Sequence, residues 1–385
     1  MRIFISTGEV SGDLQGALLI EALQRQAKDN NLELEIFALG GDRMEAAGAI
    51  LLGKTTNIGS VGILESIPFV LPTLQIQRCA KKYLRQNPPD LIVLIDYLSP
   101  NLAIGSDVKK YLPQVPIVYY IAPQEWVWSP PLGNTSRIVE ITDLLLAIFA
   151  AEGRYFQEKG VKVRWVGHPL LDRMETAPRR EAARKELGIA EDRLAIALVM
   201  ASRQQELKYL LPVIFSTAQK LQAQFPQAQF LIPLSNERFY EPIQANLAKY
   251  QLQATIVKGK TLTAIAAADL AITKSGTVNL EIALLNVPQV VIYRVNPVTM
   301  WLGRNILNFS IPFMSPVNLV LMQEIVPELL QEEATPERIF QAATELLLNS
   351  ARREQMQQKY QEMRASLGTK GACDRAAKEI IQLIS

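Results

Sequence analysis

The chain has 385 residues, of which 49% are hydrophobic and 20% are charged, and its net charge is +2. This length suffices for two domains with separate cores, and the balanced charge gives no indication of a nucleic-acid partner. The single histidine, His168, excludes a site built from several histidine ligands, and the two cysteines, Cys79 and Cys373, lack metal-ligand spacing. We therefore expect no metal, no cofactor and no disulfide framework.

The first predicted strand, residues 3–5, follows Met1 and Arg2 directly. The residues there do not form the apolar segment that is typical of a secretion signal. The sequence has no run of 18 apolar residues, so we expect no membrane-spanning helix. With two cysteines that fit a reducing compartment, the sequence predicts a cytoplasmic protein.

Short apolar runs recur along the chain, and many are continuous, which is typical of strands covered on both faces of a parallel sheet. Amphipathic helical stretches separate them, for example at residues 17–27, 76–85 and 207–224. This alternation predicts an α/β fold with two doubly wound parallel sheets. The predicted strands are Ile3–Ile5, Leu91–Ile95, Ile117–Ile121, Leu144–Ile148, Val163–Val166, Ala195–Met200, Phe230–Ile232, Thr255–Val257, Leu270–Ile272 and Val290–Tyr293.

The strand pattern stops near residues 172–180, where charged residues and Pro178 take over. We therefore expect a first domain over residues 1–172 and a second over residues 173–345. Residues 336–385 show helical patterning only, and for the last part, 346–385, packing back onto the first domain is one option.

Two glycine-punctuated turns each follow a predicted strand and precede a helical segment. The first is Thr7–Asp13, TGEVSGD, and the second is Lys274–Glu281, KSGTVNLE. The first N–H groups of a helix have no partner within the helix, so such a turn predicts a backbone site for an anion. A phosphorylated ligand between the two domains is the functional interpretation. The alternative is that the glycines only relieve backbone strain.

Ligands of open parallel sheets bind beyond the carboxyl ends of the strands. Asp96 follows the strand at 91–95 and predicts a general base, with a helix cap as the alternative. Trp126 and Trp128 follow the strand at 117–121 and suit a sugar face, an acyl chain or the core. Arg203 follows the strand at 195–200, where it predicts phosphate binding or a surface ion pair.

Glu281 lies six residues after Ser275, which places its carboxylate within reach of two ribose hydroxyls, although pairing with the helix dipole explains the same position. His168 follows another predicted strand and is interpreted as structural, because no nucleophile accompanies it. The chain contains neither a G-x-x-x-x-G-K-[ST] loop nor a G-x-G-x-x-G fingerprint, which disfavours ATP hydrolysis and NAD chemistry.

The segment Met300–Met322 combines Trp301, Phe309 and Phe313 with Arg304. A core helix followed by a loop is one interpretation. The other is a surface that enters the headgroup region of a bilayer or holds an acyl chain.

A series of motifs runs through nearly the whole chain. The motifs are Gly8–Asp13, Gly40–Gly48, Val61–Glu65, Ile95-Asp96, Tyr120–Gln124 with Trp126 and Trp128, Val166–Pro169, Ser275–Glu281, Tyr293–Val295 with Pro297 and Trp301, Asn318, and Val326–Gln331. Read in this order, they resemble the lipid-A-disaccharide synthase family. Its members are inverting glycosyltransferases of the GT-B fold, in which two Rossmann-like domains face a cleft.

The resemblance implies transfer of diacylated glucosamine from UDP-2,3-diacylglucosamine to 2,3-diacylglucosamine 1-phosphate. The products are a β-1,6-linked lipid A disaccharide and UDP. Asp96 matches the family's catalytic aspartate, and no metal is implied. The residues implied for the UDP-sugar in the second domain are Arg203, Ser275, Gly276, Thr277, Glu281 and Asn318. Those implied for the acceptor and cleft are Gly8, Glu9, Ser11, Gly12, Asp13, Gln124 and Trp126.

Three motifs depart from the family pattern. Leu-Pro-Gly-Ser-Arg is replaced by Val199–Arg203, Ala-Gly-Arg-Glu by Leu321–Glu324, and Asp-Ala-Pro-Asp-Phe-Asn by Asp96–Asn101. The second change puts Gln323 where the family has a positive charge. Two other functions therefore stay open: a reaction like that of UDP-GlcNAc 2-epimerase, and a non-catalytic homologue that binds nucleotide sugar or lipid. Peripheral contact with the inner face of the cytoplasmic membrane and a homodimer are also left open.

Overall fold

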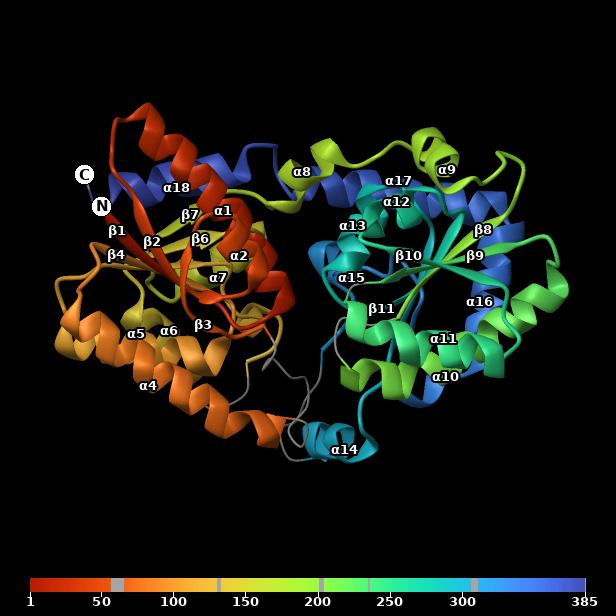
Figure 1. Ribbon diagram of the computed structural model, residues 1–385, viewed down its shortest axis with the longest axis horizontal. Helices are drawn as coiled ribbons and strands as arrows, with labels where there is room; N and C mark the ends of the chain where they lie inside the picture. The colour runs from red at the N-terminus through yellow and green to blue at the C-terminus, as the bar shows by residue number, and fades with distance from the viewer. Residues whose placement is uncertain (57–65, 130–132, 201–203, 235, 306–310, 385) are drawn as a thin grey trace. The chain divides into compact units, whose positions relative to one another are not determined.

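The computed structural model describes residues 1–56, 66–129, 133–200, 204–234, 236–305 and 311–384. These residues form two compact units, shown in Figure 1. Apart from the gaps, unit 1 contains Met1–Asp172 and Leu367–Ser385, whereas unit 2 contains Arg173–Arg304 and Ile311–Ser366. The chain therefore passes from unit 1 to unit 2 and later returns.

Unit 1 is built on a seven-stranded parallel sheet with the order β3-β2-β1-β4-β5-β6-β7. The residues of its central strands are buried on both faces, which explains why their sequences are continuous apolar runs. The strands are β1 (Arg2–Ser6), β2 (Glu35–Gly40), β3 (Ile50–Lys54), β4 (Leu91–Ile95), β5 (Ile117–Tyr120), β6 (Leu144–Ala147) and β7 (Val163–Trp165).

Alternate strand residues of unit 1 point into two separate cores. Ile3 and Ile5 belong to the core that α1 and α18 cover, whereas Phe4 belongs to the core beneath α4 and α5. The helices are α1 (Val10–Asp29), α2 (Asp42–Ala46), α4 (Val70–Gln86), α5 (Leu98–Tyr111), α6 (Asn134–Ile141), α7 (Ala150–Glu158), α8 (Leu170–Arg173) and α18 (Ala372–Gln382).

Unit 2 repeats this plan with a six-stranded parallel sheet of order β10-β9-β8-β11-β12-β13. Its strands are β8 (Ala195–Val199), β9 (Gln229–Leu234), β10 (Ala254–Lys258), β11 (Leu270–Lys274), β12 (Gln289–Tyr293) and β13 (Glu328–Leu330). Its helices are α9 (Arg180–Leu187), α10 (Gln204–Gln224), α11 (Tyr240–Lys249), α12 (Thr261–Ala266), α13 (Val278–Leu284), α14 (Pro297–Asn305), α15 (Pro316–Leu321), α16 (Pro336–Leu348) and α17 (Ser350–Ser366).

Local sequence accounts for several helix ends. Helix α9 ends at Gly188, whose φ of +67° is a left-handed conformation that glycine adopts without strain. Helix α16 begins with Pro336, and the Thr335 hydroxyl accepts a 3.3 Å hydrogen bond from the Arg338 N–H. This cap satisfies one of the free N–H groups of the first turn.

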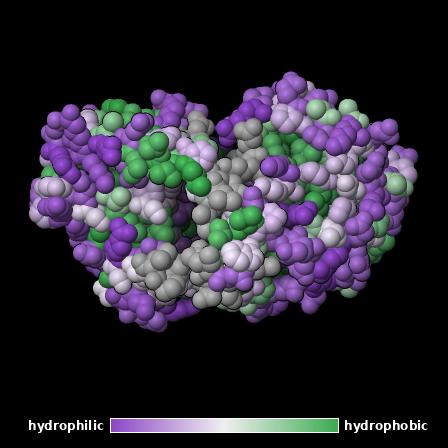
Figure 2. Space-filling view, turned by 90° about the horizontal axis from the view of Figure 1, so that it is seen from below, coloured by the Kyte–Doolittle hydropathy of each residue, from purple (hydrophilic) through white to green (hydrophobic). Residues whose placement is uncertain are grey.

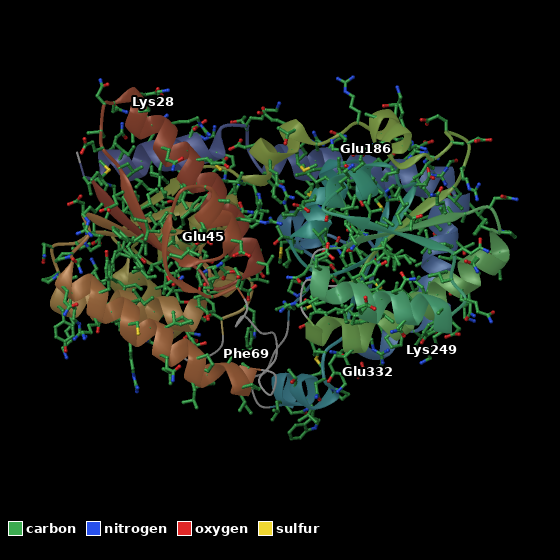
Figure 3. The ribbon with its side chains drawn as sticks, viewed as in Figure 1. Lys28, Glu45, Phe69, Glu186, Lys249 and Glu332 are labelled. Carbon is green, nitrogen blue, oxygen red and sulfur yellow. The ribbon has the colours of Figure 1, made fainter. Side chains whose placement is uncertain are left out.

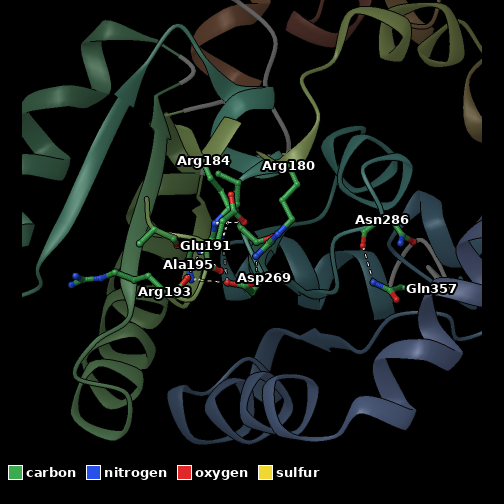
Figure 4. A network of polar contacts seen from close by, with 11 residues as sticks. Arg180, Arg184, Glu191, Arg193, Ala195, Asp269, Asn286 and Gln357 are labelled. Carbon is green, nitrogen blue, oxygen red and sulfur yellow. Dashed lines mark hydrogen bonds and ion pairs between the residues drawn. The ribbon is translucent and has the colours of Figure 1, made fainter. Parts of the chain in front are cut away.

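A polar network fixes the amino-terminal edge of the unit 2 sheet (Figure 4). The carboxylate of Asp269, just before β11, accepts a 2.6 Å bond from Arg180 Nη2 and a 2.8 Å bond from the Ala195 N–H at the start of β8. Arg184 is fully buried beside it and donates 2.9 Å and 2.6 Å bonds to the carbonyls of Ala267 and Ala190. The carboxyl edge of the same sheet is thus left to carry a ligand site.

Helix α18 belongs to unit 1, although all of unit 2 separates it from the unit's other helices in sequence. Its buried residues, among them Ile380, pack in the core shared with α1. The carboxylate of Asp172 caps it by accepting hydrogen bonds from the N–H groups of Gly371, at 2.5 Å, and Cys373, at 2.9 Å.

The predicted fold class, an α/β protein with two parallel sheets, is confirmed. Sequence analysis missed three strands, namely β2, β3 and β13. Two of them, β3 and β13, lie at sheet edges, where partly exposed residues interrupt the apolar run. The segment Met300–Met322, expected to be a core helix and loop or a membrane-facing surface, contains most of α14 and the whole of α15.

Candidate active site

Each sheet has one point where the strand order reverses. In unit 1 this switch point lies between β1 and β4, and in unit 2 it lies between β8 and β11. Loops that leave neighbouring strands there diverge to opposite faces of the sheet, which opens a crevice at its carboxyl edge. Candidate residues of both units lie at these edges, including the two glycine turns and Asp96.

In unit 1 the first glycine turn is explained by close packing. Gly8 follows β1, and a Cβ atom placed on it would lie 2.2 Å from the ring of Tyr97. Gly12 already belongs to α1, where a Cβ atom would lie 1.9 Å from the Thr7 hydroxyl. Glycine is therefore required where the segments after β1 and β4 approach each other. Glu9 is partly exposed at the N-cap of α1, and Ser11 is partly buried in its first turn.

Asp13 has a structural task that the sequence did not reveal. Its buried carboxylate accepts hydrogen bonds from the N–H groups of Gly41 at 2.8 Å, Arg43 at 3.2 Å and Met44 at 3.1 Å. It therefore caps α2 and ties this helix to α1. A direct contact with substrate would compete with these three bonds.

Asp96 and Tyr97 leave β4 in a left-handed backbone conformation, with φ values of +45° and +50°. Such a conformation costs about 1–3 kcal/mol for each residue that is not glycine. Asn101, which is fully buried, donates from Nδ2 to the main-chain oxygens of Ile95 at 3.1 Å and Asp96 at 2.7 Å. The Tyr119 hydroxyl donates a further 2.9 Å bond to the Asp96 oxygen. These contacts hold the strained turn in place.

Asn101 also connects this turn to β1. The Ser6 hydroxyl donates a 2.7 Å bond to Asn101 Oδ1, so one buried amide links the ends of the two strands at the switch point. On the other side, the Asp96 N–H donates a 2.9 Å bond to the oxygen of Ile121, another left-handed residue. The main chain around Asp96 is therefore fixed from both neighbouring strands.

Glu152 is a buried acid that sequence analysis overlooked. It accepts 2.8 Å bonds from the Ala122 and Ile148 N–H groups, which follow β5 and β6, and a 3.1 Å bond from the Phe149 N–H. Burial raises its pKa to about 7, against the opposing effect of these bonds, and the charge of Asp96 adds to the rise. The sequence feature that could have pointed to Glu152 is its place at the third position of α7, where a glutamate is typical of a capping box.

Gln124 and Trp126 form a single 3-10 turn after β5. The Gln124 side chain is exposed, whereas Trp126 is partly buried with its ring centre 5.6 Å from that of Phe149. Phe149 in turn lies 5.1 Å from the ring of His168. His168 is buried and accepts a 3.1 Å bond at Nδ1 from the Leu170 N–H, which supports its structural interpretation.

The second glycine turn, in unit 2, differs from the expected row of free N–H groups. The Gly276 N–H donates a 2.8 Å bond to Asn279 Oδ1, and Asn279 Nδ2 returns a 2.9 Å bond to the Lys274 oxygen. The Ser275 hydroxyl donates to the Met314 oxygen at 2.7 Å. The Gly276 N–H, which precedes the N-cap of α13, is therefore already bonded within the turn, and an anion site at this helix start stays a prediction. Thr277 is the N-cap residue of α13.

Glu281 is 5% exposed and forms an ion pair with Arg173, a partner that the sequence did not reveal. The two residues are 108 positions apart, so neither spacing nor motif indicates the contact. Glu281 lies in the first turn of α13, the helix that follows the glycine turn.

Asn318 is fully buried, and its amide is used inside the protein. Its Oδ1 accepts bonds from the N–H groups of Ile325 at 2.8 Å and Val326 at 2.9 Å, and its Nδ2 donates to Glu328 at 2.7 Å. Glu328 also accepts from the Met314 N–H at 2.8 Å. Asn318 therefore shapes the segment that Ser275 contacts.

Arg203, the motif residues 61–65 and residues 306–310, including Phe309, lie outside the described residues. Within Met300–Met322, Trp301 is 56% exposed and Met322 is 53% exposed, whereas Val317 and Leu319 are buried. The segment thus has both buried and exposed apolar residues, and its contact with a membrane or an acyl chain stays a prediction. In the described part of the chain, no helix is long and apolar enough to cross a membrane.

Comparison with known proteins identifies a family over almost the whole chain. The model of the family described as lipid-A-disaccharide synthetase matches residues 3–383. A lipid-A-disaccharide synthase of Gloeothece citriformis is 60% identical over 384 residues, which cover 100% of both chains. A second one, from Synechocystis, is 56% identical over 384 residues and covers 99% of this chain and 98% of its own.

Solved structures share the fold at much lower identity. Staphylococcus aureus MnaA, solved with UDP, has a TM-score of 0.67 and 16% identity, covering 100% of this chain and 96% of its own. MurG of Acinetobacter baumannii has a TM-score of 0.58 and 16% identity, covering 99% of each chain. These similarities show the fold alone, and they confirm the GT-B architecture of two parallel-sheet domains.

Proposed function

Because the chain belongs to the lipid-A-disaccharide synthase family, we propose that it transfers diacylated glucosamine from UDP-2,3-diacylglucosamine to 2,3-diacylglucosamine 1-phosphate. The enzyme class is glycosyltransferase, as in its relatives. The products are a β-1,6-linked disaccharide and UDP. The observation that carries this proposal is the full-length family match of a chain that places Asp96 at the switch point of its first sheet.

Asp96 is the proposed general base. It accepts the proton of the acceptor's 6-hydroxyl while the hydroxyl oxygen forms a bond to C1 of the donor sugar. The bond from C1 to the phosphate oxygen breaks on the opposite face, so the configuration inverts and the electron pair leaves on UDP. A base must keep a fixed position to take part in such a step, and the network around Asn101 and Tyr119 supplies this rigidity.

The UDP-sugar is proposed to bind at the carboxyl edge of the unit 2 sheet. Support comes from the loop Ser275-Gly276-Thr277, which follows β11 at the switch point, and from Glu281 on α13. Glu281 would accept hydrogen bonds from the ribose hydroxyls, and Arg203 would bind phosphate. Asn318 contributes by shaping the Met314 segment against which Ser275 rests.

The acceptor is proposed to bind at the corresponding edge of unit 1. Glu9, Ser11 and Gln124 offer partly or fully exposed polar groups there, and Trp126 offers a ring face for a sugar. Gly8, Gly12 and Asp13 act indirectly: Gly8 allows the close approach of Tyr97, Gly12 that of Thr7, and Asp13 ties α2 to α1.

Peripheral membrane contact is proposed as well, and α4 supports it. Three apolar side chains in its first turns are strongly exposed, namely Val70 at 50%, Leu71 at 71% and Leu74 at 42%, and so is Ile67, at 61%, in the 3-10 turn just before the helix. Later turns carry the basic residues Arg78, Lys81, Lys82 and Arg85. Apolar groups that enter the headgroup region beside cations that meet lipid phosphates are typical of interfacial helices.

The figures show this surface from two sides. Figure 2 views the side on which α4 lies in Figure 1, and hydrophobic residues are visible there among hydrophilic ones. Figure 3 labels Phe69 at the beginning of α4. In unit 2, exposed Trp301 on α14 is a second candidate for lipid contact.

The test is to incubate purified protein with both acylated substrates, measure UDP release and identify the lipid product by mass spectrometry. A disaccharide 1-phosphate that forms together with equimolar UDP is expected. Conversion of UDP-GlcNAc alone to its 2-epimer would favour the epimerase alternative. Binding of UDP without any product from either mixture would favour the non-catalytic homologue.

A further inference from the structure

The strongest unassigned feature near the proposed donor site is a lysine–glutamate pair at the switch point of unit 2. Lys274 is the last residue of β11, and its Nζ lies 3.1 Å from Oε1 of Glu206 in the first turn of α10. The two side chains are 12% and 16% exposed. Other lysine–carboxylate pairs in the described residues are more open, such as Lys258 with Glu237 at 51% and 72%.

The position of this pair follows from the topology. Helix α10 follows β8, and β8 and β11 are the two strands between which the strand order reverses. The ion pair therefore joins the two chain segments that leave the switch point. A parallel sheet places its ligand at this point, beyond the carboxyl ends of the strands.

The ammonium group of Lys274 also lies close to Gly276 in the glycine turn. A Cβ atom placed on Gly276 would be 3.2 Å from Lys274 Nζ and 3.9 Å from its Cε. The bare Cα of Gly276 therefore leaves room for the lysine. The φ of Gly276, +152°, is one that other residues rarely adopt, so the backbone favours glycine here.

A largely buried ammonium beside this turn matches the chemistry of UDP departure. When the bond from C1 to the β-phosphate oxygen breaks, negative charge accumulates on the diphosphate. A preorganised cation stabilises that charge more than the same cation would in open water, because less solvent screens it. Glu206 limits the conformations of the flexible lysine, which reduces the entropy lost when the phosphate binds.

We propose that Lys274 contacts the diphosphate of the donor and stabilises UDP as it leaves, with Glu206 as the residue that positions it. The inference rests on the proposed donor site in unit 2. Lys274 is thereby assigned a catalytic role, since its ammonium group would touch the leaving group. Glu206 acts indirectly, by positioning Lys274. The inference also gives a role to the glycine at 276 that a free helix N-terminus does not explain, because the Gly276 N–H is already bonded to Asn279.

Calorimetric titration with UDP and with uridine tests the phosphate contact. Loss of one charge-assisted phosphate bond in Lys274→Met should weaken UDP binding by about 10- to 100-fold. Uridine, which lacks phosphate, should bind the variant as it binds the wild type. Lys274→Arg should recover part of the UDP affinity. Equal UDP affinity of Lys274→Met and wild type would overturn the proposal, and so would a parallel loss of uridine binding.

A double variant separates function from folding. Lys274→Met leaves the Glu206 carboxylate without this partner, so the double variant Lys274→Met, Glu206→Gln removes that charge as well. The double variant should unfold at a urea concentration close to that of wild type and still bind UDP weakly. Strong UDP binding by the double variant would show that the carboxylate, rather than the missing ammonium, caused the loss, and would overturn the inference.

Lys258→Met is a matched control, because Lys258 also ends a strand of this sheet and pairs with a glutamate, Glu237, at 3.2 Å. It lies three strands from β11, and UDP affinity should not change.

The turnover number of Lys274→Met should fall about 100-fold with saturating substrates. If wild-type protein itself neither binds UDP nor forms product, the proposed function fails. If wild type is active and Lys274→Met equals it, the Lys274 inference alone fails.

Discussion

Asn101 Nδ2 donates a 2.7 Å hydrogen bond to the main-chain oxygen of Asp96, within a turn whose residues 96 and 97 are both left-handed. The bond acts on the backbone and leaves the Asp96 carboxylate to other partners. A fully buried amide thus maintains a strained segment next to the proposed reacting group.

Replacement of Asp96 by asparagine should lower turnover by about 10²–10⁴, because the amide keeps the size of the side chain but cannot accept a proton. The measurement is UDP release with both acylated substrates at saturation. Asp90→Asn is the control, since Asp90 precedes the same strand and its interaction with the Arg2 N–H, at 2.7 Å, needs only an acceptor. Near wild-type turnover of Asp96→Asn would refute the general-base role.

Gly8→Ala should destabilise unit 1 and reduce activity, because the new methyl group would overlap the Tyr97 ring. A loss of about 1–3 kcal/mol in the free energy of unfolding, measured with urea, is typical of such overpacking. The loss should shrink in a Tyr97→Ala background, where the ring is absent. Gly153→Ala in α7 is the control, as its methyl group would make ordinary contacts of 3.4 and 3.5 Å. An equal cost of Gly8→Ala in both backgrounds would contradict the packing explanation.

Glu281→Ala should weaken UDP binding at least tenfold, the effect of losing charge-assisted hydrogen bonds to the ribose. Calorimetric titration with UDP measures it, and circular dichroism checks the fold, since Arg173 loses its ion-pair partner. Glu186→Gln is the control because Glu186, labelled in Figure 3, forms an exposed ion pair with Lys260 in the same unit. Unchanged UDP affinity of a folded Glu281→Ala variant would remove Glu281 from the site.

Acidification should destabilise the protein through His168. Burial lowers its pKa from the usual 6.5 to about 3, so below pH 6.5 the unfolded chain binds a proton that the folded protein does not. The contribution of His168 to stability is therefore greatest above pH 6.5 and falls by up to about 1.4 kcal/mol per pH unit on acidification. Urea unfolding at pH 7.0 and 5.5 should show a smaller difference for His168→Asn, whose oxygen can still accept from Leu170. The same pH dependence in both proteins would disprove this assignment.

Wild-type protein should float with anionic vesicles at low salt, and the variant Val70→Ser, Leu71→Ser, Leu74→Ser should float less. The three side chains are exposed, so their loss removes lipid contact with little effect on folding. Leu348→Ser, at a position 65% exposed in unit 2, is the control, and Trp301→Ser tests α14 separately. If wild-type protein stays at the bottom of the gradient, the proposed membrane contacts of α4 and α14 are both refuted.

The periodicity of apolar residues was sufficient to predict the two parallel sheets, because central strands such as β4 are buried along their whole length. It did not locate β3, whose apolar run of three residues, Ile50–Leu52, is followed at once by Gly53 and Lys54. For the site, the position of Asp96 followed from the predicted strand at 91–95, whereas the partner of Glu281 could not be predicted. Arg173 is distant in sequence, and a contact of that kind depends on how the folded elements meet.

The return of α18 to unit 1 has a consequence for biosynthesis. The core on one face of the first sheet includes Cys373, Ala377 and Ile380, which the ribosome adds only after all of unit 2. Until then, apolar residues of α1 and β1 lack part of their cover, while unit 2 can already bury its own core. Although domains generally fold from the amino terminus during translation, this chain order favours completion of the second unit before the first. During that interval the nascent chain presents an incomplete apolar face that chaperones recognise.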